Sequence, residues 1–277
     1  MKLGLLYEVQ IPKPWTPGIE ARTYGEVIEQ VVLADQLGWG HDVGGRASSA
    51  PAMSHCPAPE VLFGALTQRT SRIRIGHGIA LLPRNFNHAL RIAERAAVLD
   101  ILSGGRVDLG TGRAVTLQEL DGFDVNPDDT QAMWAEAIEI LVRSWKDEPV
   151  QFAGKFYNIP SSYVVPKPIQ KPHPPLWLAG TNPATFSLAG QKGLGMLGCD
   201  RHSGRIGAAN RRVQRSGQAC RAGGRIRQRS VRSADPDLLR RDTQAGHRRR
   251  YAPTSDCSPA CRRTLSALGR KRTRAQT

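Results

Sequence analysis

A glycine-rich turn that ends in an arginine is the most informative stretch for chemistry. The run GRVDLGTGRA occupies residues 105–114 and contains Gly110, Gly112 and Arg113. Glycines at a strand end let the backbone come close to a ligand, and an arginine after them can bind a phosphate through two parallel hydrogen bonds. Position 115 is a valine, so the third glycine of the dinucleotide-binding fingerprint is missing. The alternative interpretation of this motif is a tight turn with an exposed arginine.

Strands and helices alternate along the first 200 residues and must position this turn. Hydrophobic periodicity predicts strands over 2–7, from 41, and over 73–82, 106–109, 176–179 and 195–198. It predicts helices over 24–37, 60–67, 88–102, 128–145 and 185–191, and a small hairpin over 151–163. The alternation implies a parallel sheet, either open and doubly wound or closed into a barrel. In both, ligands meet the carboxyl ends of the strands, here 8–10, 76–79, 110–113 and 180–181.

Charge divides the chain into two parts. Residues 201–277 carry 21 Lys and Arg against 4 Asp, so the chain's net charge of +15 comes entirely from this segment. We therefore predict a folded domain over 1–199 and an arginine-rich, disordered tail over 200–277. A nucleic-acid-binding arm is the alternative, but the arginines lack interleaved aromatic residues or a helical stripe, which makes nucleic acid an unlikely partner.

The cysteines and histidines give no metal or disulfide pattern. Cys56, Cys199, Cys220, Cys257 and Cys261 have no spacing typical of a disulfide framework or a zinc site, so we predict no metal. The start of the chain lacks a signal-peptide pattern, and no apolar run reaches the roughly 18 residues of a membrane-spanning helix. These features lead us to expect a cytoplasmic protein without a membrane partner.

Six blocks together resemble the bacterial luciferase-like flavin-dependent monooxygenases. They are MKLGLLYEVQIPKP, TYGEVIEQVVLADQLGWG, APEVLFGALTQRTSRIRIGHGIALLP, NHALRIAERAAVLDILSGGRVDLGTGR, VVPKPIQKPHPPLWLAG and LAGQKGLGMLG, in family order over most of residues 1–199. The resemblance implies a (β/α)8 TIM barrel that binds reduced FMN, or the deazaflavin F420 in a sister branch. It implies a monooxygenase that uses O2 on a small, apolar organic substrate, with a separate flavin reductase and a homodimer as expected partners. F420-dependent hydride transfer is the alternative activity.

The resemblance also implies roles for particular residues. Arg113 and Thr181 match the positions that hold the flavin phosphate, and Gly112 and Gly180 would let main-chain amides reach the cofactor. A non-proline cis peptide under the flavin ring would fall at Gly78-Ile79. These six residues are the predicted cofactor-binding set.

One family feature is absent. The family has Glu-His-His after its second strand, where this chain has residues 46–51, Arg-Ala-Ser-Ser-Ala-Pro. Codons for this stretch can be chosen so that a one-base shift reads Glu-His-His-Leu-Leu, and the sequence from about 200 can be explained in the same way. We therefore hypothesise frameshifts at about 44–53 and from about 200, which leave a barrel of about six strands of doubtful activity. The catalytic residue stays unknown, with His77 as a weak candidate.

Overall fold

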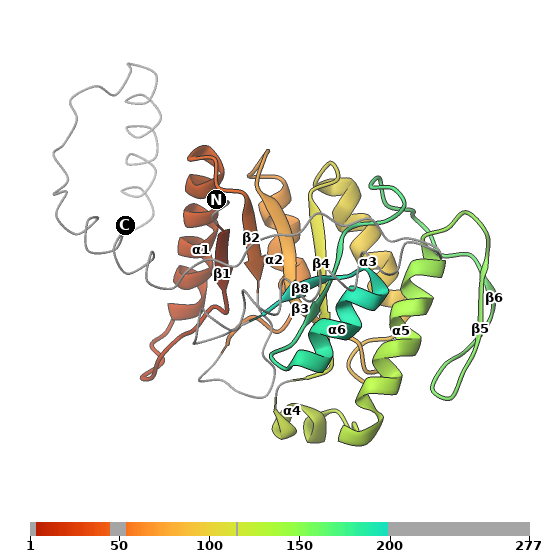
Figure 1. Cartoon of the computed structure of the whole chain (residues 1–277). Coiled ribbons are helices and arrows are strands. Elements are labelled where there is room, and N and C mark those ends of the chain that lie inside the picture. Colours follow the sequence, from red (N-terminus) through yellow and green to blue (C-terminus); the bar gives the residue numbers. More distant parts are fainter. Residues whose placement is uncertain (1–3, 45–53, 115, 199–277) are drawn as a thin grey trace, which may run out of the picture. The chain divides into compact units, whose positions relative to one another are not determined.

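The computed structural model describes residues 4–44, 54–114 and 116–198, and for 41–44 it describes the backbone alone. Within these residues, strands and helices alternate as the periodicity predicts (Figure 1). The strands are β1 (Gly4–Tyr7), β2 (His41–Gly44), β3 (Arg74–Leu81), β4 (Val107–Gly112), β5 (Val150–Ala153), β6 (Asn158–Ser162), β7 (Leu176–Ala179) and β8 (Gly195–Leu197). The helices are α1 (Ile19–Gln36), α2 (Pro59–Thr67), α3 (Ala89–Leu102), α4 (Leu117–Gly122), the 3-10 turn η1 (Pro127–Asp129), α5 (Thr130–Ser144) and α6 (Pro183–Lys192).

Six strands form one parallel sheet in the order β1-β2-β3-β4-β7-β8. The order follows the chain without a reversal, so there is no switch point of the kind that defines a doubly wound sheet. Right-handed crossovers that always advance in one direction place their helices on one face of the sheet. The described sheet is therefore wound like that of a barrel and not like an open, doubly wound sheet, the other predicted architecture. The remaining two strands, β5 and β6, form the predicted antiparallel hairpin.

The core lies between the sheet and its helices. In β4, Leu109 joins the largest buried cluster, and the Thr111 hydroxyl receives a hydrogen bond of 3.2 Å from Trp134 Nε1 on α5. The predicted aromatic stripe of α5 is buried, which confirms it as core: Trp134, Ala137, Ile138, Leu141 and Trp145. Because side chains alternate along a strand, Asp108, Gly110 and Gly112 face the opposite, inner side of the sheet.

Helix boundaries follow local capping. The Asn182 side chain accepts a hydrogen bond of 2.8 Å from the Thr185 amide and so starts α6, and Gly193 ends it with φ of 68°. In η1, Asn126 caps by accepting from the Asp128 amide. Asp129 is the N-cap residue of α5, but its side chain makes no capping hydrogen bond and pairs with Lys155.

Two helical segments differ from the sequence prediction. α1 begins at Ile19, five residues before the predicted start at 24. The prediction began too late because the first turn is largely exposed and shows no apolar stripe. α4 was missed. Thr116 accepts a hydrogen bond from the Glu119 amide, so the capping-box spacing of these two residues was the signal that could have predicted it.

Candidate functional site

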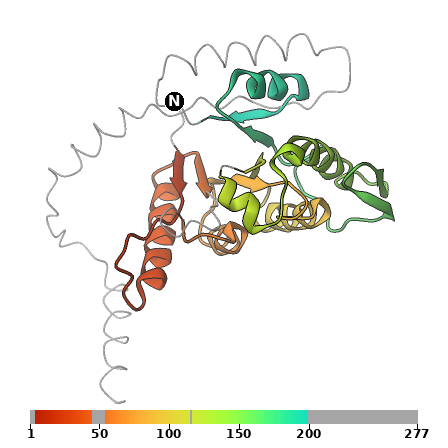
Figure 2. The same ribbon diagram turned by 90° about the horizontal axis from the view of Figure 1, so that it is seen from below.

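The predicted cofactor residues lie at the carboxyl ends of three neighbouring strands. β3 pairs with β4 up to Leu81 and Gly112, and β4 pairs with β7 up to Thr111 and Leu178. Arg113 lies in a bend directly after β4, and Gly180 directly follows β7. Gly78 and Ile79 on β3, Gly112 and Arg113 at the end of β4, and Gly180 and Thr181 after β7 therefore belong to neighbouring strands of one sheet. β3 and β4 lie side by side in both views (Figures 1 and 2).

The peptide bond between Gly78 and Ile79 is trans, so the expected cis bond is wrong for this structure. Among the described residues, cis peptide bonds precede Pro14, Pro166 and Pro172. The backbone at 78–79 is nevertheless irregular. His77 pairs with Leu109 and Ala80 with Thr111, so Gly78 and Ile79 together lie opposite Gly110 in a β-bulge.

Two of the predicted glycines lie close to neighbouring side chains. A β-carbon on Gly112 would lie 2.0 Å from Ile79 Cδ1, and one on Gly180 would lie 2.3 Å from Thr185 Cγ2. Such separations are far below van der Waals contact. The close approach at Gly112 shows that Ile79 points to the inner side of the sheet. Ala179 Cβ lies on the same side, 3.8 Å from the position of a β-carbon on Gly112. Ile79 and Ala179 thus give this end of the sheet an apolar wall.

Arg113 is the cation of this region that is available to a ligand. Its side chain is exposed and makes no hydrogen bond or ion pair with other described residues. Thr181 is exposed too, and directly after it Asn182 caps α6. The N-terminus of α6 offers few amides to a ligand, because Pro183 has no N–H and the Thr185 amide donates to Asn182 Oδ1. A guanidinium and a hydroxyl that follow neighbouring strands are groups that favour a phosphate. The residues present therefore fit the phosphate of a flavin nucleotide.

His77 points away from these residues. Its ring packs edge-to-face against Phe63 on α2, with ring centres 5.0 Å apart, on the helix side of β3. Burial lowers the pKa of His77 to about 4, although Glu60 opposes the shift. The imidazole is therefore neutral near pH 7 and lies outside the group formed by the six predicted residues.

Sequence reasoning missed Trp177. Leu176 and Leu178 face the helices, so Trp177 between them faces the inner side of the sheet. It is buried, and its Nε1 has no hydrogen-bond partner. A β-carbon on Gly195 would lie 2.2 Å from the indole, so the ring lies against β8. The alternation of LWLA was the signal that could have assigned it to the inner face.

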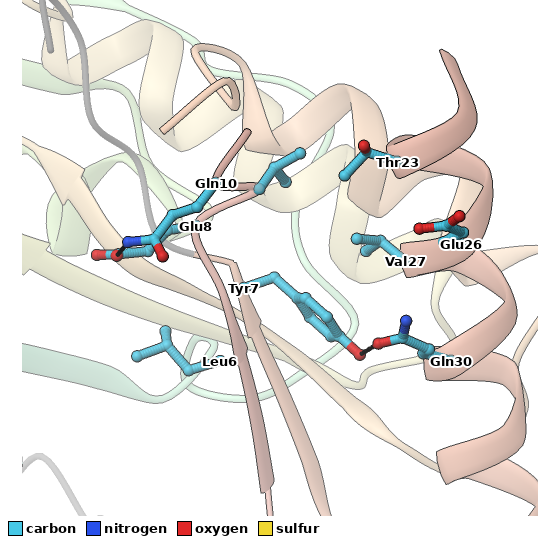
Figure 3. A pocket seen from close by; sticks show the side chains of 9 residues that line it. Leu6, Tyr7, Glu8, Gln10, Thr23, Glu26, Val27 and Gln30 are labelled. Carbon is cyan, nitrogen blue, oxygen red and sulfur yellow. Dashed lines mark hydrogen bonds between the residues drawn. The ribbon is translucent and has the colours of Figure 1, made fainter. Parts of the chain in front are cut away.

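A cavity of about 310 Å³ lies at the end of β1, the first of the predicted ligand-facing strand ends (Figure 3). Its lining residues come from β1, the segment after it, and α1: Leu6, Tyr7, Glu8, Val9, Gln10, Thr23, Glu26, Val27 and Gln30. The Tyr7 hydroxyl donates a 2.8 Å hydrogen bond to Gln30 Oε1 and so connects strand and helix. None of the six predicted cofactor residues lines this cavity, so it is a separate feature.

The hypothesised frameshifts and the second-strand histidine position fall at residues outside the described ranges, as do Cys199 and the later cysteines. Within those ranges, no three His, Cys, Asp or Glu side chains are grouped to hold a metal ion. No helix in the described part of the chain has the length and apolar character to span a membrane.

Comparison with known proteins identifies the family. The profile of the luciferase-like monooxygenases matches residues 1–235. The chain belongs to this family. The match extends past the predicted domain boundary at 199, which stays a prediction. A solved luciferase-like fold, the monooxygenase RslO1 from Streptomyces bottropensis, aligns with a TM-score of 0.74 at 25% identity over 98% of this chain and 80% of its own.

Curated relatives of this luciferase-like chain fall into two cofactor groups. The oxygenase component of the flavin-dependent trigonelline monooxygenase from Acinetobacter baylyi is 30% identical over 63% of this chain and 48% of its own length. The F420-dependent glucose-6-phosphate dehydrogenase from Microbacterium testaceum is 32% identical over 63% of this chain and 48% of its own. The chain spans about half the length of these relatives. The TIM-barrel fold and a family of oxidoreductase enzymes are thereby confirmed, and the family contains both flavin-dependent and F420-dependent members.

Proposed function

We propose that this chain binds FMN and acts as a flavin-dependent monooxygenase on a small, apolar organic substrate. The observation that carries the proposal is exposed Arg113, without a partner among the described residues, at the end of β4, next to the strand β7 that Gly180 and Thr181 follow. Reduced FMN supplies the electrons that activate O2, and a separate reductase would deliver it. Family membership and the flavin-dependent relative support this assignment.

The residues of the chain have binding and orienting roles in this proposal. Arg113 would hold the phosphate through two parallel hydrogen bonds, and the Thr181 hydroxyl would donate a further one. Ile79 and Ala179 would contact the apolar part of the ligand and exclude water from it. Trp177 faces the same inner side, with an indole N–H that has no protein acceptor.

The proposal is tested by comparing FMN with riboflavin, which lacks the phosphate. Arg113→Ala should weaken FMN binding about 10- to 100-fold, the range expected for lost charge-assisted hydrogen bonds. Binding of riboflavin should stay unchanged. Flavin fluorescence titration measures both dissociation constants.

Arg91→Ala is the matched control, because Arg91 is an exposed arginine on α3 that pairs only with Glu94 in the described structure. It should bind FMN like the wild type. Equal FMN affinity of the wild-type chain and Arg113→Ala would contradict the proposed site.

F420-dependent hydride transfer is the second candidate, and the F420-dependent relative favours it. F420 also carries a phosphate, so Arg113 does not discriminate between the two cofactors. Oxygen uptake with reductase-supplied FMN distinguishes them, because hydride transfer to F420 consumes no O2. Uptake that depends on an added apolar substrate would favour the monooxygenase.

A further inference from the structure

The backbone on both sides of Arg113 is held by other parts of the protein, although the Arg113 side chain has no partner among the described residues. The Leu82 amide at the end of β3 donates a 3.0 Å hydrogen bond to the carbonyl of Gly112, the residue before Arg113. Ala114, the residue after it, packs against a small group of apolar side chains. Arg113 is therefore an exposed side chain on a backbone whose two neighbouring residues are fixed.

This apolar group joins the segment after β3 to the β4–α5 connection, of which residues 113–114 and 116–129 are described. We name it the loop cluster, and its members are Leu120, Val125 and Met133 at the centre with Phe86, Ala114, Phe123 and Phe156 packed against them. Phe86 follows β3 and Phe123 follows α4, and their ring centres lie 4.7 Å apart. Packing between these two segments limits where the connection, and with it Ala114, can lie.

The end of α4, within this connection, has the hydrogen bonds of a Schellman motif. The Val125 amide donates to the Leu120 carbonyl at 2.9 Å. The Asp124 amide donates to the Asp121 carbonyl at 3.2 Å. Asp124 therefore takes the left-handed conformation, with φ of 52°, at a position where glycine is the usual residue. The carbonyls of Phe123 and Asp124 come after the last turn of the helix and need a donor from outside it.

Asn85, which directly precedes Phe86 after β3, supplies this donor. Its Nδ2 donates a hydrogen bond of 3.0 Å to the Phe123 carbonyl and one of 2.7 Å to the Asp124 carbonyl. A primary amide carries two N–H groups, so both bonds can form at once. Asn85 is itself exposed, so its replacement by alanine opens no cavity in the core. One exposed side chain thus satisfies both carbonyls at which the chain turns from α4 toward α5.

We propose that Asn85 is a positioning residue for the phosphate site, because it holds the β4–α5 connection and the connection orients Arg113. This inference rests on the proposed function, since Asn85 acts through Arg113. A guanidinium on a backbone that is already fixed loses less conformational freedom when it binds a phosphate, which raises affinity. Loss of the Asn85 hydrogen bonds should therefore lower affinity for the phosphate although Arg113 itself is still present.

The test is Asn85→Ala in the full chain, with the affinities for FMN and riboflavin measured by fluorescence titration. FMN affinity should fall about 3- to 10-fold, and riboflavin affinity should stay unchanged. Hydrogen exchange of peptides that cover residues 116–126 should become faster in the flavin-free variant. Asn158→Ala is the matched control, because Asn158 is an exposed asparagine on β6 without a side-chain hydrogen bond to other described residues. The control should bind both flavins like the wild type.

A double-mutant cycle with Arg113→Ala separates positioning from a general structural role. In the Arg113→Ala background, Asn85→Ala should cause no further loss of FMN affinity. An equal loss in both backgrounds, a parallel loss of riboflavin affinity, unchanged FMN affinity or unchanged hydrogen exchange would each overturn the role of Asn85. These outcomes leave the proposed function intact. Unchanged FMN affinity of the Arg113→Ala variant would instead overturn both.

Discussion

The two ends of the parallel strands differ in how their charges are satisfied. At the amino ends, the Arg106 side chain donates five hydrogen bonds to Ser103, Thr67, Thr70 and Ile73. At the carboxyl ends, Arg113 is exposed and unpaired within the described residues. The Arg106 guanidinium at the amino ends is therefore occupied by hydrogen bonds within the protein. The Arg113 guanidinium at the carboxyl ends has no partner among the described residues and can bind a ligand. The same division between stability and function is general for barrels of parallel strands.

Other charged side chains at the amino ends are also satisfied by hydrogen bonds or ion pairs within the protein. Asp35 accepts backbone hydrogen bonds from Ser71, Arg72 and Ile73. Burial alone would raise its pKa, but these hydrogen bonds outweigh that effect and hold the pKa below 3.8. Arg74 pairs with Asp108 at 2.8 Å on the inner side of the sheet. Removal of any such group should therefore reduce stability and leave ligand affinity unchanged.

The largest loss of stability is expected for Arg106→Ala. It would leave several buried carbonyl groups without donors, which costs about 2–4 kcal/mol of unfolding free energy. Urea unfolding followed by circular dichroism measures the change. Arg91→Ala serves as the exposed control and should stay within about 0.5 kcal/mol of the wild type. Similar unfolding midpoints for the two variants would break the distinction between the two ends.

The second-largest loss of unfolding free energy, about 2–3 kcal/mol, is expected for Gly110→Ala, because the added β-carbon would lie 2.0 Å from the backbone oxygen of His77. Gly112→Ala should cost only about 1 kcal/mol, since there the clash is with the movable end of Ile79. The same unfolding assay compares the pair. If both variants lose the same unfolding free energy, the backbone at His77 beside the bulge yields as easily as the side chain of Ile79, which would contradict this prediction.

Asp35→Asn should cost about 1–2 kcal/mol at pH 7, because the amide would direct N–H groups toward the backbone donors of 71–73. The folded pKa of Asp35 is depressed, so its contribution is present above the unfolded pKa and is lost as pH falls through the folded pKa. Wild-type stability should therefore fall below about pH 4 more steeply than that of the variant. Parallel curves in thermal melts from pH 2 to 7 would exclude this role.

The smallest effect on stability is expected for Arg113→Ala, within about 0.5 kcal/mol, because its side chain is exposed and unpaired in the described structure. This variant completes the comparison, since its effect should appear in FMN affinity alone. A melting temperature that drops as for Arg106→Ala would show that Arg113 has a structural role.

Local sequence patterns determined the elements and the order in which they occur. The strand at 176–179 and the buried stripe of α5 could be predicted because alternation and helical spacing are properties of contiguous residues. The glycines and Arg113 after β4 could likewise be placed at a strand end. The family resemblance rested on these same blocks.

Only the tertiary structure decided which of these residues meet. The bulge at Gly78-Ile79, the direction of His77 toward Phe63 and the pairing of β4 with β7 all depend on register between segments that are distant in sequence. Register is set by packing of side chains across strands and against helices, and no single segment contains that information. For the same reason the contact of β1 with α1, where Tyr7 donates a hydrogen bond to Gln30, emerged only from the folded chain.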